Sequence, residues 1–428
     1  MQLQVRARLP HREGVLKIEE PVFELASNPM SSSSEFQVEH ASCRSKWGRN
    51  LRLQVMLRLV LYLWLGFLAF FIGGYLSYFG YLRRRAKGSW GFEIDPKFNP
   101  SISILVPAHN EEKVIVPKLE NLKEVSYPRD RMEIILVDDA STDQTLVKAQ
   151  NFLEGNPELR VRIVHQTKRQ GKACGLNAAL KNCSSGIVVV TDADTFWPPD
   201  ILRRALPYMV SSVVGAISGM GQAENADQSW VTNAEKSYMD MMSTWRLGES
   251  KIHSTIRFEG CFCVFKREAF EEFDSESGAD DSGTALRVIQ NGYRAVLVPE
   301  ARTQSEIPYT IMNMVRAKLR RAVHLTGLWV QCLRLLAGKR LKLPKRIAVP
   351  EIFLSLFMPF IFVVLVCLTL LVLVCYPIPF GILFAFLGLA CLVPKVRSLL
   401  VQGILHQFIL CYAVILYATK KKFVAWER

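Results

Sequence analysis

From Ser101 to Val210, short apolar segments alternate with amphipathic ones, and this alternation restricts the fold more than any other feature of the sequence. The segments expected to form strands read SISILVPA, MEIILVDDA, VRIVHQ and GIVVVTDAD. Helices are expected after them, at residues 113–125, 144–153, 172–181 and 200–210. Such interleaving is typical of βαβ units, so we predict an α/β fold with a mainly parallel sheet covered by helices on both faces.

Polar residues follow each of these four predicted strands. PAHNEE follows the first, DDASTD the second and QTKRQGKACGLN the third, and the fourth ends in Asp192-Ala193-Asp194. Ligands of open parallel sheets bind in the crevice beyond the carboxyl ends of the strands. Four successive polar strand ends therefore predict one binding site at this edge.

Asp192 and Asp194 are the strongest metal candidates in the chain. Alternate residues of an extended chain point the same way, and hard divalent cations prefer carboxylate oxygens. Taken alone, the pair has an alternative explanation, because Asp is also favoured in turns. The other polar strand ends favour the metal site.

Common nucleotide-binding loops are absent from the sequence. Gly171-Lys172 is followed by Ala173 and has no glycine five positions upstream, so it is not a P-loop. The stretch GMGQAE lacks the third glycine of a dinucleotide fingerprint. Kinase, ATPase and dehydrogenase functions are therefore not favoured.

Apolar runs on both sides of this region predict membrane helices. The run from Val55 to Leu82 is long enough to cross a bilayer, and it begins too late and is too long for a cleaved signal peptide. Residues 348–394 and 399–418 supply two or three further helices. The last block either crosses the membrane or lies along its interface, so the number of spans stays open.

The formal net charge is +14, from 53 basic and 39 acidic residues. Many of the bases flank apolar blocks, in RNLRL, YLRRRAKG, AGKRLKLPKR and TKKKF, where they would meet anionic lipid headgroups. No nucleic-acid reader motif accompanies them, so we predict no nucleic-acid partner. The ten cysteines show no zinc or disulfide spacing, which indicates a cytosolic globular part.

These patterns divide the chain into four parts. Residues 1–50 are polar and aperiodic, and we expect a disordered extension there. Residues 55–82 form a transmembrane helix, and residues 99–336 form the cytosolic domain with an interfacial helix at its end. Residues 348–418 form the two or three C-terminal transmembrane helices.

The motifs between residues 101 and 329 together resemble those of the family 2 glycosyltransferases with the GT-A fold. The resemblance is greatest to the membrane-embedded group that includes cellulose, hyaluronan and poly-N-acetylglucosamine synthases. The motifs are VPAHNEE, ILVDDASTDQT, RQGKACGLNAAL, VVVTDADT, FEGCFCVFKREAF, GADDSGTALRVIQNGYRAVLVPEA and RAKLRRAVHLTG. Their order and spacing carry the resemblance. It implies an inverting glycosyltransferase that uses a nucleoside-diphosphate sugar, UDP being favoured over GDP, on the cytosolic face of a membrane.

The resemblance also assigns roles to residues at the crevice. Asp138 or Asp139 would accept the N–H of the nucleotide base, and Lys172 would lie near the pyrophosphate. Asp192 and Asp194 would hold the diphosphate through Mg²⁺ or Mn²⁺, which offsets charge on the leaving group. The remaining nucleotide-sugar-binding residues of the first motif would be Pro107, Ala108, Asn110 and Glu111.

The resemblance places the catalytic base at Asp281, with Asp280 where the family usually has Glu. Asp281 would take the proton from the acceptor hydroxyl as it attacks the anomeric carbon, and the result would be inversion. N-capping is the alternative explanation for an acidic pair at a helix start. Cys261 and Cys263 are expected to be packing thiols, because two cysteines without a further ligand make a poor metal site.

The last motif departs from the polymerising members of the family, which have Gln-x-x-Arg-Trp. Ala317 stands at the position of the Gln and Arg321 at the position of the Trp, whereas Arg320 matches the Arg of the motif. Arg320, together with Arg316 and Lys318, either contacts diphosphate oxygens or forms the basic face of an interfacial helix.

The missing Trp favours a single transfer to a lipid-linked acceptor, and a growing polysaccharide stays open as the other acceptor. The alternative function is that of a catalytically inactive GT-A-like membrane scaffold or partner subunit. The retained carboxylates argue against it. A sugar-nucleotidyltransferase would need a glycine-rich phosphate loop, which PAHNEE is not.

Overall fold

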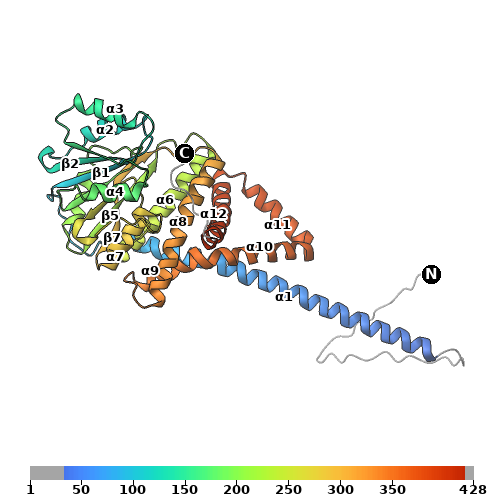
Figure 1. Ribbon diagram of the computed structural model, residues 1–428. Coiled ribbons are helices and arrows are strands. Elements are labelled where there is room, and N and C mark those ends of the chain that lie inside the picture. Colours follow the sequence, from blue (N-terminus) through green and yellow to red (C-terminus); the bar gives the residue numbers. More distant parts are fainter. Residues whose placement is uncertain (1–32, 420–428) are drawn as a thin grey trace, which may run out of the picture. The chain divides into compact units, whose positions relative to one another are not determined.

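The computed structural model describes residues 33–419 (Figure 1). The described residues fall into two units that divide between Arg58 and Leu59. Helix α1 (Ser33–Ala86) contains the predicted transmembrane run. It also contains residues 33–50, which belong to the part of the chain where we expect a disordered extension. The segment holds no proline, and the helix of the apolar run continues into it. The rest of the predicted extension, residues 1–32, lies outside the described residues.

A seven-stranded sheet with the order β3-β2-β1-β4-β6-β5-β7 forms the centre of the second unit. Neighbouring strands are parallel except that β6 runs antiparallel to both β4 and β5. The predicted α/β fold with a mainly parallel sheet is therefore confirmed. The strands are β1 (Ile102–Ala108), β2 (Met132–Asp138), β3 (Val161–His165), β4 (Ile187–Val190), β5 (Val214–Ala223), β6 (Cys263–Lys266) and β7 (Arg294–Ser305).

Helices cover both faces of the sheet, because alternate residues of the strands point to opposite sides. Leu105 of β1 belongs to the core under α4 and α7, whereas its neighbour Ile104 belongs to the core under α2, α3 and α5. Both side chains are fully buried. The helices that cover the two faces are α2 (Ile115–Glu124), α3 (Thr145–Glu154), α4 (Lys172–Leu180), α5 (Ile201–Ala205) and α7 (Asp280–Gln290).

Three helices of the described residues are long and apolar enough to cross a membrane. They span Leu51–Ala86, Lys345–Cys375 and Val396–Ala418. The second combines α9 (Lys345–Ile352), a π-helical turn and α10 (Met358–Cys375), and the third belongs to α12 (Pro394–Ala418). The shorter apolar helix α11 (Pro377–Ala390) connects them.

Helix α12 packs against α6 (Trp230–Ile252) and α8 (Ile311–Ala337), and the three lie side by side (Figure 1). At their junction, Lys318 Nζ lies 2.6 Å from Glu235 Oε2 and donates a hydrogen bond of 2.7 Å to Gln402 Oε1. Lys318 is only 8% exposed. Lys318 therefore joins the helices to one another, and this contact does not favour the alternative in which Lys318 contacts diphosphate oxygens. Arg316 lies exposed two residues nearer the helix start.

A buried ion pair joins the C-terminal apolar block to the sheet domain. Glu351 of α9 is fully buried and accepts hydrogen bonds from Arg257, whose Nη2 lies 2.5 Å away, and from the indole N–H of Trp245. Arg257 also stacks on the Trp329 ring, with 5.3 Å between the guanidinium carbon and the ring centroid. The chain just before β6 is thus tied to the start of α9.

We expect Glu351→Gln to lower the stability of the folded chain by about 3 kcal/mol, because it removes the buried carboxylate that pairs directly with the Arg257 guanidinium. The thermal unfolding midpoint of the detergent-purified chain measures this loss. Glu268→Gln is the matched control, since Glu268 is exposed. Equal midpoints for the two variants would contradict the prediction.

Candidate active site

Lys172, the first residue of α4, meets three carboxylates that come from two other elements. Its Nζ lies 2.9 Å from Asp192 Oδ1, 3.2 Å from Asp280 Oδ2 and 3.5 Å from Asp281 Oδ2. Burial alone would lower the pKa of Lys172, but the three carboxylates hold the pKa well above its usual range. The structure thus brings the start of α4, the end of β4 and the start of α7 into one cluster, which we call the acidic cluster.

Gly260 forms the floor of the acidic cluster, where an added side chain would meet the charged groups. A Cβ at this position would lie 2.5 Å from Lys172 Nζ, 2.7 Å from Asp281 Oδ2 and 3.0 Å from Asp192 Oδ2. Contacts this short require the charged groups to move. The absence of a side chain at residue 260 therefore lets the four charged groups converge.

We expect Gly260→Ala to lower the turnover number by about 100-fold, because misplacing reacting groups by about 1 Å has effects of that size. A glycosyl-transfer assay with far-UV circular dichroism separates lost activity from lost structure. Gly186→Ala is the control, since a Cβ at Gly186 meets nothing within 4 Å. Full activity of Gly260→Ala would show that the cluster tolerates an added methyl group.

Asp280 and Asp281 open α7, but neither caps it. The N-cap position belongs to Ala279, which makes no side-chain capping bond, so the N-capping explanation is wrong. Burial raises the pKa of Asp281 well above its usual range, Asp280 raises it further, and Lys172 opposes both. A carboxylate with a raised pKa is a stronger base than an exposed one.

The loops after β1 and β2 hold each other at the crevice. The Asn110 amide donates to Ser141 Oγ at 3.0 Å, and Asn110 Oδ1 accepts from the Thr142 amide at 2.8 Å. Asn110 and Ala140 have positive φ angles of 57° and 54°, a backbone strain that clusters at functional sites. Pro107 and Ala108 lie buried at the end of β1, and the buried Glu111 donates its amide to Thr145 Oγ1 at 2.7 Å.

Asp138 and Asp139 are buried, and both side chains have polar partners within the protein. Asp139 accepts hydrogen bonds of 2.8 Å from the amides of Gln170 and Gly171, one at each carboxylate oxygen. Asp138 Oδ2 lies 2.8 Å from His165 Nδ1. Asp139 thus fixes the loop that leads into Lys172, a contact that the sequence did not predict.

Asp192 and Asp194 follow β4 at the same edge of the sheet. The Asp192 side chain is 26% exposed, and Asp194 is exposed. No group of three or more His, Cys, Asp or Glu residues that could hold a metal occurs in the described part of the chain. Two carboxylates at an open crevice suit Mg²⁺ or Mn²⁺, which keeps water or diphosphate oxygens as its other ligands, so these residues fit the predicted metal.

Arg320 lies exposed on α8, one turn before His324. His324 Nδ1 contacts the carbonyl oxygen of Gly278, just before α7. No hydrogen bond or ion pair joins Arg320 to the acidic cluster within residues 33–419. The structure therefore brings Arg320 to the neighbourhood of α7 but not into contact with the cluster.

Cys261 and Cys263 are free thiols next to Gly260. Burial raises the pKa of the Cys261 thiol to about 12 and raises the pKa of Cys263 well above its usual range. Neither thiol is a nucleophile at neutral pH, which agrees with the prediction of packing thiols.

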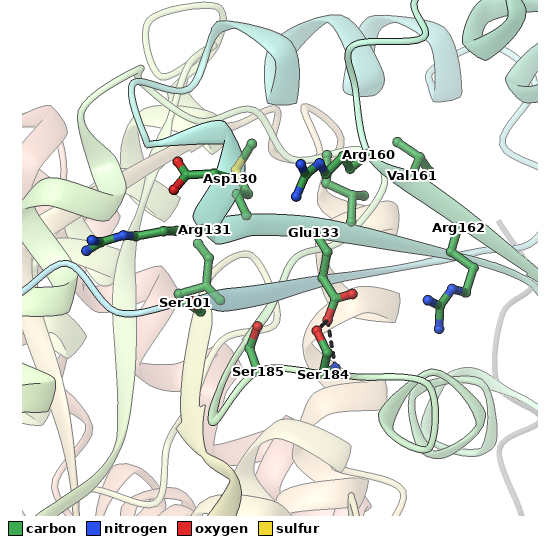
Figure 2. A pocket seen from close by; sticks show the side chains of 12 residues that line it. Ser101, Asp130, Arg131, Glu133, Arg160, Val161, Arg162, Ser184 and Ser185 are labelled. Carbon is green, nitrogen blue, oxygen red and sulfur yellow. Dashed lines mark hydrogen bonds between the residues drawn. The ribbon is translucent and has the colours of Figure 1, made fainter.

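A pocket of about 340 Å³ lies at the opposite, amino-terminal edge of the sheet (Figure 2). Arg131, Arg160 and Arg162 line it, and Glu133 accepts hydrogen bonds of 2.8 Å from the Ser184 amide and hydroxyl. None of the predicted site residues lines this pocket. The candidate active site is therefore the acidic cluster at the carboxyl edge.

Comparison with known proteins shows that the chain is similar to glycosyltransferases. Residues 103–274 match the family model "Glycosyl transferase family 2". "Probable glycosyltransferase YdaM" of Bacillus subtilis is 28% identical over 250 residues, which cover 56% of this chain and 57% of that protein. "Beta-monoglucosyldiacylglycerol synthase" of Synechocystis is 38% identical over 118 residues, which cover 28% of this chain and 25% of that protein. These matches thus cover only part of each relative.

One solved structure is similar over most of the chain. It is the mannosyltransferase PcManGT of Pyrobaculum calidifontis in complex with GDP-Man and Mn²⁺. The TM-score is 0.73 at 29% identity, and the match covers 85% of this chain and 100% of that one. The segment that matches the family model, residues 103–274, begins in β1 and ends between β6 and α7. It therefore contains Lys172, Asp192 and Asp194. Residues 103–274 therefore match the glycosyl transferase family 2, and the sheet domain has the GT-A fold.

Proposed function

We propose that the protein is an inverting glycosyltransferase that moves a sugar from a nucleoside diphosphate to a lipid-linked acceptor at a membrane. The observation that carries the proposal is the acidic cluster, where Lys172, Asp192 and Asp281 converge over Gly260 at the carboxyl edge of the sheet. One cation and separate carboxylates in a crevice suit a diphosphate leaving group and a hydroxyl nucleophile.

Asp192 and Asp194 would hold Mg²⁺ or Mn²⁺, which supplies positive charge for the leaving diphosphate when bound. Lys172 adds a cation at the same end of the site. Asp281 would accept the proton of the acceptor hydroxyl, and its raised pKa suits that task. Attack from the face opposite the diphosphate inverts the anomeric centre.

The loops after β1 and β2 would hold the nucleotide. The residues proposed there are Pro107, Ala108, Asn110, Glu111, Asp138 and Asp139. Asp138 or Asp139 would accept the base N–H. Both already have partners, since Asp139 accepts two backbone amides and Asp138 accepts the Ser141 amide and lies against His165. Arg320 would reach the diphosphate only if its exposed side chain swings from α8 toward α7.

The comparisons support the donor class and leave its base to experiment. PcManGT was solved with GDP-Man and Mn²⁺, which supports a nucleoside-diphosphate sugar and a divalent metal here. The sequence motifs favour UDP. A relative named beta-monoglucosyldiacylglycerol synthase supports a lipid acceptor, as does Arg321 in place of the Trp of the polymerising enzymes.

The membrane arrangement belongs to the same proposal. The helices Leu51–Ala86, Lys345–Cys375 and Val396–Ala418 would anchor the chain as a multi-pass protein. The sheet domain would face the cytosol, where sugar nucleotides and reduced thiols are both expected.

The decisive experiment incubates the detergent-purified full chain with radiolabelled UDP- and GDP-sugars, MnCl₂ and a membrane lipid extract. We expect label in the lipid fraction. Label in a polymer would replace the lipid acceptor by a growing polysaccharide. Label in neither fraction, with every donor tested, would favour the inactive scaffold.

A further inference from the structure

A lysine that is not part of the acidic cluster lies beneath the turn carrying Asp192 and Asp194. Lys118 of α2 is fully buried, and its Nζ donates hydrogen bonds to Thr191 Oγ1 at 2.8 Å and to the Thr195 carbonyl at 2.5 Å. Thr191 immediately precedes Asp192, and Thr195 immediately follows Asp194. One side chain therefore ties both ends of the metal-binding turn.

Burying an ammonium group costs free energy unless it finds partners inside the protein, so the partners of Lys118 indicate its role. Lys118 Nζ lies 4.6 Å from the centroid of the Trp197 ring. Burial lowers the pKa of Lys118 to about 7, while Asp192 and Asp194 act in the opposite direction. The amine donates hydrogen bonds in either protonation state, so both ties to the turn persist across neutral pH.

Thr191 also connects the turn to the segment that contains Gly260. Thr191 Oγ1 accepts the hydrogen bond from Lys118 Nζ and keeps its own proton for a carbonyl. The Cys261 carbonyl lies 3.3 Å from Thr191 Oγ1 and accepts a hydrogen bond of 3.1 Å from Trp197 Nε1. Cys261 follows Gly260, so these contacts link the metal-binding turn to the floor of the acidic cluster.

We propose that Lys118 is a positioning residue that fixes the spacing of Asp192 and Asp194 and their distance from Gly260. Two carboxylates on an untied turn repel each other and separate, whereas a divalent cation needs both on one side. The inference rests on the proposed function for the identity of the metal. It adds a residue that touches neither the metal nor the sugar nucleotide.

The test measures Mn²⁺ binding to the full chain in detergent from the electron paramagnetic resonance signal of free Mn²⁺, with UDP or GDP present. We expect Lys118→Met to weaken Mn²⁺ binding by about 10- to 100-fold, the usual effect of removing a group that orients a metal ligand. Lys123→Met is the matched control, because Lys123 is exposed on the same helix.

Thr191 provides a second pair of variants that keeps the test decisive if Lys118→Met does not fold. Thr191→Val keeps the shape and removes the hydroxyl, so Mn²⁺ binding should weaken. Thr191→Ser keeps the hydroxyl and should restore it, an outcome that loss of packing would not give. Wild-type Mn²⁺ affinity in Lys118→Met and Thr191→Val would overturn the positioning role and leave the proposed function intact. A wild-type chain that neither binds Mn²⁺ nor transfers sugar would overturn both.

Discussion

Asp281→Asn is expected to lower the turnover number by about 1,000-fold, within the range that a positioned general base contributes. The amide cannot take the proton of the acceptor hydroxyl, whereas its size preserves the packing at the start of α7. The pKa of Asp281 is held above its usual range by burial and by Asp280. Turnover of the wild-type chain should therefore fall on acidification at a pH above the ordinary Asp range.

Asp280→Asn is the control for this effect, since Asp280 lies 3.2 Å from Lys172 and carries the neighbouring charge. Removing it should lower the pKa of Asp281 and cost less turnover than Asp281→Asn. Metal-dependent nucleotide binding, measured by calorimetry, should survive in Asp281→Asn. If Asp280→Asn is the more damaged variant, the base is Asp280 and the assignment is wrong.

Asp194→Ala is expected to weaken binding of the nucleoside diphosphate by about 100- to 1,000-fold in the presence of Mn²⁺. Loss of one of two carboxylate ligands removes several kcal/mol of metal-mediated stabilisation, and each 1.4 kcal/mol is about tenfold in affinity. In EDTA the variant and the wild-type chain should bind alike, because the metal contributes to neither.

Calorimetric titrations with UDP and GDP, with and without Mn²⁺, measure both quantities. Asp200→Ala is the control, since Asp200 forms an exposed ion pair with Arg204 outside the site. An equal loss of affinity in Mn²⁺ and in EDTA would mean that Asp194 contacts the nucleotide or supports the fold, and not the metal.

The first half of the sheet follows from local sequence patterns. The strand predicted at SISILVPA appears as Ile102–Ala108, and the helix predicted at residues 172–181 appears as Lys172–Leu180. Short apolar runs and amphipathic periodicity are local properties of the sequence. They can therefore be recognised without knowing which segments pair in the fold. The convergence of polar strand ends at one edge follows from the parallel order.

The second half could not be read in this way. The antiparallel β6 lies between β4 and β5, and only pairing between distant segments decides that order. The contacts of Lys318 also depend on distant segments. Its basic neighbours in the sequence suggested phosphate binding, but in the structure α8 packs on α6 and α12, and Lys318 pairs with Glu235. Sequence spacing does not tell which face of such a helix is covered.

Lys118 was missed although the sequence carries a signal for it. Ile115, Lys118, Leu119 and Leu122 follow the i, i+3, i+4, i+7 spacing of a buried helix face, and all four are buried. A lysine on the apolar stripe needs a partner inside the protein. The partners, Thr191 and Thr195, follow β4, three strands further along the chain, so the pattern indicates burial but not its purpose.

The Cys261 carbonyl shows how part of this site escapes comparison of sequences. Thr191 and Trp197 both meet the main-chain oxygen of residue 261, which every amino acid carries. Evolution is therefore free to exchange the side chain at residue 261 while the contact persists. We expect relatives to keep the residue type at Thr191, Trp197 and Gly260 instead. A comparison limited to invariant side chains would therefore miss the role of the peptide unit at residue 261.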